Sequence, residues 1–349
     1  MVSSRRALAK LPPFLAKGLG EHYDGREWPR RTTPQAIRRR SIVKTRAIMQ
    51  RIDIKIGFDC NNKCFFCVQG DKRYHYPNKT TEEVKKILGD ARRETDSIVF
   101  TGGEVTIRPD FPELVRHAAS LGFARVQVQT NGRAFASKKY CETIVRAGAN
   151  EFSPAIHGPR PEIHDYLVNA AGAFKQTVMG IRNLKEMGQI VIMNSVITRP
   201  NYRHLPETAR LFVALKVDQF QFAFVHALGS AGKNFEMMVP RKSLIEPYLK
   251  RALQIGIQAG CRVMTEAIPY CFMEGFEANV AERYIPHTKI IDADWVVDDY
   301  TEYRWTEGKA KGPNCGECAY FDECEGPWKE YPEAYGWSEF IPRKTKAHV

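Results

Sequence analysis

Six of the nine cysteines stand in two tight groups. Cys60, Cys64 and Cys67 fall within eight residues, and Cys315, Cys318 and Cys324 fall within ten. Such clusters in a long chain are typical of metal or iron–sulfur sites, whereas disulfides are characteristic of small secreted domains. Three thiolates on one loop can hold three irons of a [4Fe–4S] cluster and leave the fourth iron open. The alternative is a zinc knuckle, but a closed zinc site needs four ligands, and the first group supplies three.

The elements that must position these cysteines follow a repeated strand–helix pattern. Short β-branched runs alternate with segments of helical period, which is typical of βα units around a parallel sheet. The expected strands are 51–58, 97–101, 125–130, 151–156, 190–198 and 218–225, and the expected helices are 81–94, 111–121, 137–147, 172–187 and 204–216. Six units are too few for a closed eight-unit barrel. We therefore expect an α/β fold with a partial (β/α)6 barrel.

The rest of the chain suggests two further parts. A helix is expected at 243–259 and a strand at 261–268, after which residues 269–349 are irregular and rich in Pro, Gly, aromatic residues and Cys. A segment of this kind needs a metal site to hold it together. The sequence thus predicts a basic arm over 1–48, a barrel over 49–230 and a small C-terminal iron–sulfur domain over 231–349.

The first cysteine group resembles the signature of the radical S-adenosylmethionine (radical SAM) superfamily. Three features carry the resemblance over about residues 50–226: the spacing CxxxCxxC with Phe66 before the last cysteine, the run Thr101 to Glu104 (TGGE) ending the second strand, and the βα repeat. Val105 departs from the pattern, because a proline is common there. No clear adenine-binding pattern is present on the fifth strand.

The resemblance implies both cofactors and roles. Cys60, Cys64 and Cys67 would hold a [4Fe–4S] cluster whose open iron binds S-adenosylmethionine. Gly102 and Gly103 would let the backbone approach a ligand, and the Glu104 carboxylate would accept the methionine ammonium group. The reduced cluster would then cleave S-adenosylmethionine to methionine and a 5′-deoxyadenosyl radical, which abstracts hydrogen from a substrate.

Polar residues at the ends of later strands are further candidates, since ligands of parallel barrels bind at the carboxyl ends of the strands. Asn131, Ser153 and Asn194 are candidate cosubstrate contacts, with Ser153 and Asn194 assigned to the ribose and the methionine carboxylate; the alternative is that they are polar packing residues of the strands. The candidate substrate contacts, each of which could instead be structural, are His157, Arg199, His226 and Glu266.

The second cysteine group resembles the SPASM/Twitch extension of radical SAM enzymes. Trp328 stands where a complete SPASM pattern has a further cysteine, which favours one auxiliary [4Fe–4S] cluster. Cys271 is the better candidate for its fourth ligand and Cys261 the alternative, while Cys141 is expected to be a buried structural thiol. A zinc ribbon built from the same cysteines is the competing interpretation.

The positive charge of the chain lies mostly at its beginning. Residues 1–51 hold 13 Lys/Arg and 3 Asp/Glu, which accounts for +10 of the total formal charge of +12. This arm is either a solvated extension or a contact for a polyanionic partner. We expect no membrane span, no secretory signal and a cytoplasmic location.

The leading hypothesis is a radical SAM enzyme acting on a peptide, a protein or a small molecule, with flavodoxin or ferredoxin as electron donor. The alternatives are an RNA-modifying radical SAM enzyme and a non-catalytic iron–sulfur carrier. The TGGE run counts against the carrier, because a carrier has no need to hold methionine.

Overall fold

The fold is built on a nine-stranded sheet with the order β7-β6-β5-β4-β3-β2-β1-β8-β9. The computed structural model describes residues 50–346, so the predicted arm over 1–48 lies outside the described residues. The strands are β1 (Arg51–Lys55), β2 (Ser97–Thr101), β3 (Arg125–Thr130), β4 (Glu151–Pro154), β5 (Ile190–Ile197), β6 (Gln219–Phe224), β7 (Arg262–Glu266), β8 (Thr288–Ile291) and β9 (Val296–Val297). All neighbours are parallel except β8 and β9, which are antiparallel.

The expected partial barrel is confirmed. Within residues 50–346 the sheet does not close, because β7 and β9 are its two edges. All six predicted barrel strands are present with ends shifted by a few residues, and β7 matches the seventh expected strand. β8 and β9 were not predicted, since they are four and two residues long and depend on pairing with β1 and with each other.

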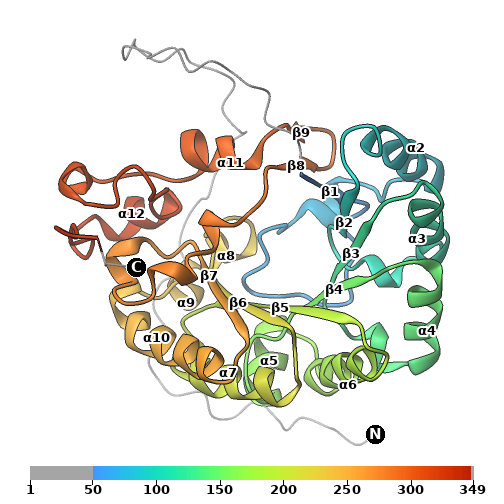
Figure 1. The fold of residues 1–349 in the computed structure, drawn as a ribbon, viewed down its shortest axis with the longest axis horizontal. Coiled ribbons are helices and arrows are strands. Elements are labelled where there is room, and N and C mark those ends of the chain that lie inside the picture. Colours follow the sequence, from blue (N-terminus) through green and yellow to red (C-terminus); the bar gives the residue numbers. More distant parts are fainter. Residues whose placement is uncertain (1–49, 347–349) are drawn as a thin grey trace, which may run out of the picture. The chain divides into compact units, whose positions relative to one another are not determined.

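The longer helices lie along the outer side of the strands (Figure 1). The longer ones are α2 (Thr81–Ala91), α3 (Phe111–Ser120), α4 (Lys138–Ala147), α5 (Pro161–Val168), α6 (Ala173–Glu186), α7 (Leu205–Ala214) and α10 (Lys242–Gln258). The short ones are α1 (Lys72–His75), α8 (Ser230–Lys233), α9 (Phe235–Met238), α11 (Tyr300–Tyr303) and α12 (Glu330–Tyr335). Helix α5 was not predicted: it is eight residues long and ends at Asn169, whose left-handed φ of 48° stops it before α6.

Local sequence explains where several helices begin and end. Thr80 starts α2 with a capping box, in which its side chain accepts from the Glu83 amide and the Glu83 carboxylate accepts from the Thr80 amide. Gly148 ends α4 with φ +114°, a conformation that favours glycine. These caps fix the turns that lead into the neighbouring strands.

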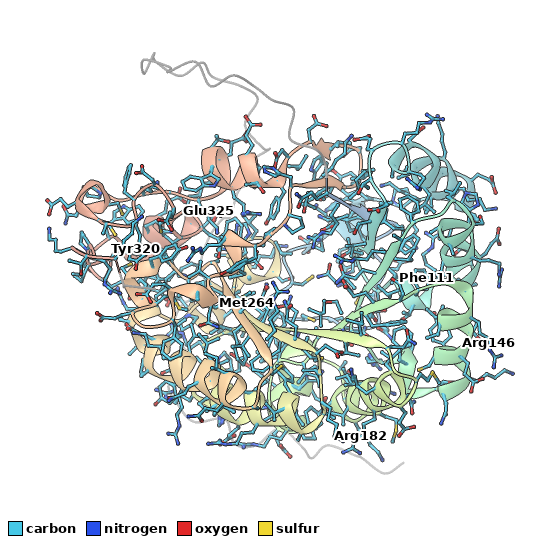
Figure 2. The ribbon with its side chains drawn as sticks, viewed as in Figure 1. Phe111, Arg146, Arg182, Met264, Tyr320 and Glu325 are labelled. Atoms are coloured by element: carbon cyan, nitrogen blue, oxygen red, sulfur yellow. The ribbon has the colours of Figure 1, made fainter. Side chains whose placement is uncertain are left out.

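The two faces of the strands differ in character. Phe220, Phe222 and Phe224 of β6 are buried, and Gly256 of α10 packs so closely that a Cβ there would lie 2.5 Å from the Phe220 ring. Burying each such ring stabilises the fold by about 1.5–3 kcal/mol. The alternate residues of the strands face the inside of the barrel and include polar groups such as Gln221 and Lys55. Figure 2 shows the same contrast on the helices, with Arg146 and Arg182 projecting from the outer side.

The C-terminal part of the chain is joined to this sheet. β7 pairs with β6 and β8 pairs with β1, although both lie within the segment 231–349 that was expected to form a separate domain. The described residues 50–346 all lie in one compact unit. The irregular segment that carries Cys315, Cys318 and Cys324 follows these strands.

Candidate active site at the carboxyl ends of the strands

The loop after β1 brings Cys60, Cys64 and Cys67 together. Burial raises the pKa of the Cys60 thiol to about 11. Burial, and then the neighbouring Cys67 and Cys60, raise the pKa of Cys64 well above its usual value. Three thiols on one partly buried loop suit a [4Fe–4S] cluster, which would take them as thiolates and release their protons on binding. The donor set therefore fits the predicted cluster.

Distant elements hold this cysteine loop in place. The Lys63 and Phe65 amides donate to the carbonyls of Val168 and Leu167 at the end of α5, over 2.9 and 3.1 Å. The Arg133 guanidinium donates to the Asn61 carbonyl and to Asn62 Oδ1, both over 2.7 Å. Helix α5, which sequence reasoning missed, thus supplies part of the support of the predicted cluster loop.

The two glycines of the TGGE segment pack closely against the backbone of the residues just before Cys60. The Gly103 amide donates to the Gly57 carbonyl over 2.8 Å, and the Glu104 amide donates to the Asp59 carbonyl over 2.7 Å. A Cβ at Gly102 would lie 2.1 Å from the Gly57 oxygen, and Gly102 also has φ +132°. In the structure the close approach that these glycines permit is to the cysteine loop itself.

Glu104 presents a buried carboxylate beside this loop. Its side chain accepts from Thr130 Oγ1 over 2.6 Å, from the Asn131 amide over 2.5 Å, and from the Thr106 amide and hydroxyl over 3.1 and 2.5 Å. Burial raises the pKa of Glu104, and these hydrogen bonds act against that rise. Within the described part of the chain these bonds all come from neutral groups, so the ammonium group of a ligand would supply the missing positive charge.

Asn131, Ser153 and Asn194 occupy three different environments. Asn131 holds Glu104 through its backbone, and its side chain donates to Asn61 Oδ1 over 2.6 Å. Ser153 donates to the Ile192 carbonyl over 2.8 Å, which ties β4 to β5. Asn194 Oδ1 is buried and has no hydrogen-bond partner among the described residues. An unpaired buried acceptor suits a hydroxyl donor from a ligand.

Phe66 and His157 pack together behind the loop. Their ring centroids lie 4.6 Å apart at an edge-on angle of 68°. His157 Nδ1 accepts from the Val196 amide over 3.0 Å, and burial lowers the pKa of His157 well below its usual value. A neutral, buried histidine that joins β4 to β5 acts here as a support of the site wall.

The other three candidate substrate contacts lie toward the C-terminal segment. Arg199 donates to the Val239 carbonyl and to the Tyr335 hydroxyl, both over 2.9 Å, so it holds α12 in place. His226 stacks on Trp328 with centroids 4.0 Å apart. Glu266 accepts from Gln221 Nε2 over 2.5 Å, and burial and then Glu282 raise its pKa.

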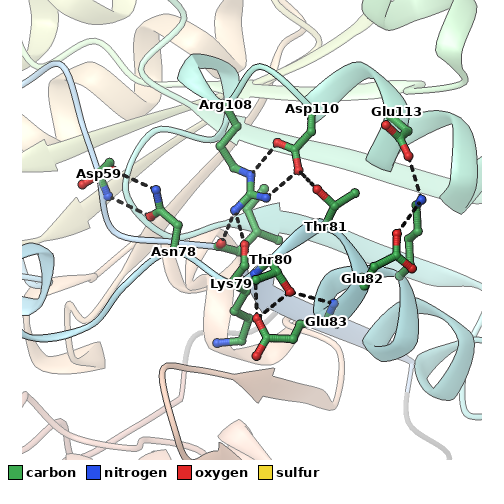
Figure 3. A network of polar contacts seen from close by, with 12 residues as sticks. Asp59, Asn78, Lys79, Thr80, Thr81, Glu82, Glu83, Arg108, Asp110 and Glu113 are labelled. Carbon is green, nitrogen blue, oxygen red and sulfur yellow. Dashed lines mark hydrogen bonds and ion pairs between the residues drawn. The ribbon is translucent and has the colours of Figure 1, made fainter.

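Sequence reasoning missed the brace that supports the end of β1. Arg108 donates to the carbonyls of Ile56 and Lys79 over 2.8 and 2.7 Å and pairs with Asp110 over 2.6 Å (Figure 3). Asn78 Oδ1 accepts from the Phe58 amide over 3.0 Å. These contacts fix the residues that lead into Cys60. The sequence signal is weak, since Arg108 and Asp110 differ from ordinary surface charges only by following the TGGE run.

The second cysteine group lies around one pocket. Cys271, Cys315, Cys318 and Cys324 line it together with Lys311 and Phe321. Burial, and then Cys324, Cys315 and Cys318, raise the pKa of Cys271. No group of three or more His, Cys, Asp or Glu side chains in residues 50–346 is placed to hold a single metal ion.

The remaining two cysteines lie elsewhere. Cys261 Sγ lies 3.5 Å from the Val217 carbonyl, just before β7 begins. Cys141 is buried in α4 and its Sγ donates to the Phe135 carbonyl over 3.0 Å, as a structural thiol does.

Known proteins resemble this chain in sequence. Residues 54–212 match the family model of the Radical SAM superfamily. The AdoMet-dependent heme synthase of Oleidesulfovibrio alaskensis is 28% identical over 70% of this chain and 55% of its own length. The PqqA peptide cyclase of Rhodopseudomonas palustris is 26% identical over 59% of this chain and 55% of its own length. The chain spans about half the length of these curated relatives.

Solved structures share the fold. Streptococcus suis SuiB bound to S-adenosylmethionine matches with a TM-score of 0.61 at 14% identity, over 85% of this chain and 76% of that chain. Native anSMEcpe with bound AdoMet matches with a TM-score of 0.61 at 15% identity, over 83% and 96%. Among the described residues, no helix has the length and apolar character to cross a membrane. The matched range contains the cysteine loop and Glu104, and residues 54–212 resemble the radical SAM superfamily, whose members use a [4Fe–4S] cluster and S-adenosylmethionine.

Proposed function

We propose that this chain is a radical SAM enzyme that cleaves S-adenosylmethionine reductively and abstracts a hydrogen atom from a peptide, protein or small-molecule substrate. The observation that carries the proposal is the packing of the TGGE segment on the cysteine loop, which leaves the buried Glu104 carboxylate with neutral donors only. When bound and reduced, the cluster supplies the electron that breaks the carbon–sulfur bond of the sulfonium.

The residues of this chain bind and orient. Cys60, Cys64 and Cys67 hold the cluster, and Glu104 accepts the ammonium group of the cosubstrate. Asn194 Oδ1 offers an unpaired acceptor for a ribose hydroxyl. Phe66, packed on the neutral His157, covers the loop and excludes water from it. These roles require a rigid loop, which the backbone bonds to α5 and to the TGGE segment provide.

The C-terminal cysteines form the second part of the proposal. We propose that Cys271, Cys315, Cys318 and Cys324 hold one auxiliary [4Fe–4S] cluster in a Twitch-like segment within 231–349. The pocket that they share supports Cys271 as the fourth ligand over Cys261. Four cysteine ligands would leave no open iron, which favours electron transfer from the substrate radical over direct substrate binding. A zinc ribbon remains the alternative occupant.

The substrate class is drawn from the relatives. The relatives include a heme synthase and a peptide cyclase, and SuiB has been solved bound to its precursor peptide SuiA. These names support a peptide or small-molecule substrate. We further propose flavodoxin or ferredoxin as the electron donor and the reducing cytoplasm as the location. The RNA alternative rests on the basic arm, which lies outside the described residues. The carrier alternative gives the buried Glu104 carboxylate no role.

The test is formation of 5′-deoxyadenosine by the anaerobically reconstituted protein with dithionite and S-adenosylmethionine. The wild type should form it without added substrate, and the triple variant C60A/C64A/C67A should not. The matched control is C261A, which removes a thiol far from the loop and should retain cleavage. Equal product from the wild type and the triple variant would reject the proposal, as would the absence of product from a wild type loaded with iron.

A further inference from the structure

Two lysines pair with one carboxylate at the carboxyl ends of β1 and β8, and a third lysine binds backbone carbonyls beside it. Lys55 is the last residue of β1, and its ammonium group pairs with Asp292, the residue that follows β8. Lys72 Nζ, on α1, lies 2.8 Å from Asp292 Oδ1. Lys79 Nζ donates to the carbonyls of Asp292 and Ala293 over 2.6 and 2.8 Å. The mechanism described above uses none of these side chains.

The direct contacts of this lysine group pair two ammonium groups with a single carboxylate. Lys55 and Lys72 share one carboxylate, and Lys79 is bound to carbonyl oxygens, with Glu83 and Asp294 as its more distant negative neighbours. Burial, and then the charge of Lys55, lower the pKa of Lys72. A salt bridge that served only to join α1 to β8 would need one cation for its carboxylate. The surplus charge would be relieved by an additional anion.

Lys72 also has unused hydrogen-bond donors. An ammonium group has three N–H donors, and the Lys72 ammonium has Asp292 as its one oxygen acceptor among the described residues. The rest of its surroundings is aromatic, with the Trp295 ring centroid 4.3 Å away and the Phe58 centroid 5.4 Å away. Trp295 is 41% exposed, so this corner is open to solvent on one side.

The lysine group around Asp292 lies at the same end of the barrel as the cofactor residues. Lys55 alternates with the buried Ile54 and therefore faces the inside of the barrel. Its partner in the β1–β2 register is Thr101, the residue directly before Gly102. Lys55 also precedes Cys60 by five residues. Phe58, in the same segment, has its ring next to the Lys72 ammonium group. A ligand held here would lie beside the loop that holds the cofactors.

We propose that Lys55 and Lys72 bind an anionic group of the substrate, a carboxylate or a phosphate, with Trp295 as the wall beside it. Asp292 lies between the two ammonium groups and accepts from both. The proposal rests on the proposed function, because it names the substrate class of the same site. Charge-assisted hydrogen bonds to oxyanions are the chemistry that such a pair of ammonium groups provides.

The test is the affinity of the anaerobically reconstituted protein for inorganic pyrophosphate, measured by calorimetry at low ionic strength. The variants K55Q and K72Q should each bind pyrophosphate about tenfold more weakly than the wild type. K72R keeps the charge and should bind within about threefold of the wild type. The matched control is K85Q, since Lys85 lies on the outer surface of α2 in an exposed ion pair with Glu113.

The variant D292N distinguishes an anion-binding site from a salt bridge that only joins α1 to the end of β8. Loss of its negative charge should leave pyrophosphate binding as tight as in the wild type or tighter, whereas a purely structural salt bridge would lose order and binding together. The proposal is overturned if K55Q and K72Q bind like K85Q, if D292N binds as weakly as K72Q, or if the wild type does not bind pyrophosphate. Formation of 5′-deoxyadenosine without substrate, measured in the same preparations, reports separately on the proposed function.

Discussion

At the residue scale, Glu104 shows what the fold must provide to keep a carboxylate buried. A buried carboxylate without partners is costly, and two threonines and two backbone amides offset that cost. None of these donors neutralises the charge, so the folded protein still holds a carboxylate whose pKa burial raises. A bound ammonium group would remove this penalty. Affinity for S-adenosylmethionine and the ionisation of Glu104 should therefore be linked.

The substitution Glu104→Gln tests this link. The amide keeps the shape of the side chain but loses its charge, so affinity for S-adenosylmethionine should fall about tenfold or more while the iron content stays the same. Because the pKa of Glu104 is raised, acid should protonate it earlier than an exposed glutamate, and the affinity of the wild type should fall as pH is lowered. The variant should lack this acid-side loss. Calorimetry over a pH series measures both, with the exposed Glu113→Gln as control; unchanged affinity in E104Q would show that the carboxylate does not hold the cosubstrate.

His164 carries a second pH-dependent effect at this scale. Its Nδ1 accepts from the His157 amide over 3.0 Å, and burial lowers the pKa of His164 to about 4. The unfolded chain binds a proton at about pH 6.5, so the stability contributed by this neutral histidine is present above that pH and is lost as pH falls toward 4.

The substitution His164→Asn keeps an acceptor for the His157 amide and removes the titrating ring. Urea unfolding of the cluster-free protein between pH 6.5 and 4.5 should then show a smaller loss of the free energy of unfolding, by up to about 1.4 kcal/mol per pH unit. The control is His75→Asn, at an exposed position that should leave the pH dependence unchanged. An identical slope in H164N and in the wild type would contradict the assignment.

At the element scale, the sequence patterns predicted what depends on local periodicity. The strands β1 to β6 and helices such as α3 and α6 were predicted because they are long enough to show alternation or helical period. β8 and β9 were not, since their pairing with residues more than 200 positions away or across a short turn leaves no periodic signal. For the same reason, the cysteines and Glu104 could be predicted from the sequence, because they form a local motif. The Lys55–Asp292 contact could not be predicted, because it joins two distant segments.

The partners of the polar residues at strand ends could not be predicted from the sequence. Arg199, placed at a strand end by its sequence position, donates to Val239 and Tyr335 and holds a helix of the C-terminal segment. His226 stacks on Trp328 from that segment. The type of a residue does not reveal a partner 100 positions away, so these side chains could be assigned only once the packing of the C-terminal segment was known.

The Arg108 brace gives a prediction at this scale. Arg108 joins the end of β1 to the start of α2 through two carbonyls, and Asp110 holds its guanidinium. Arg108→Ala should lower the free energy of unfolding by about 2 kcal/mol, because two backbone carbonyls lose a charged donor and Asp110 loses its partner. The exposed Arg146→Ala should change it by less than about 0.5 kcal/mol. Urea denaturation measures both, and equal effects would mean that the brace adds no stability.

At the scale of the whole molecule, a buried ionic network holds the C-terminal segment against β7. Arg304 and Lys309 both contact Glu325, over 2.8 Å each, and Lys309 also reaches Glu282 over 2.7 Å. Glu282 in turn accepts from the Ala267 amide, directly after β7. All four side chains are nearly inaccessible to solvent. Figure 2 labels Glu325 within the C-terminal segment. Separating these buried pairs would leave buried charges without their partners, which is strongly destabilising.

This fixed arrangement places Cys271 with the other C-terminal cysteines and leads to the last prediction. The wild type, reconstituted anaerobically, should bind about eight irons, four for each cysteine group. Cys271→Ala should lower this to about four irons, because the auxiliary group loses one of its four ligands, whereas Cys261→Ala should keep all eight. C60A/C64A/C67A should also bind about four, which shows that the two groups load independently. Iron and sulfide analysis with absorption spectra measures these contents. Tightly bound zinc in the wild type, loss of all iron in either cluster variant, or a C261A variant that loses as much iron as C271A would overturn the assignment of two clusters with Cys271 as a ligand.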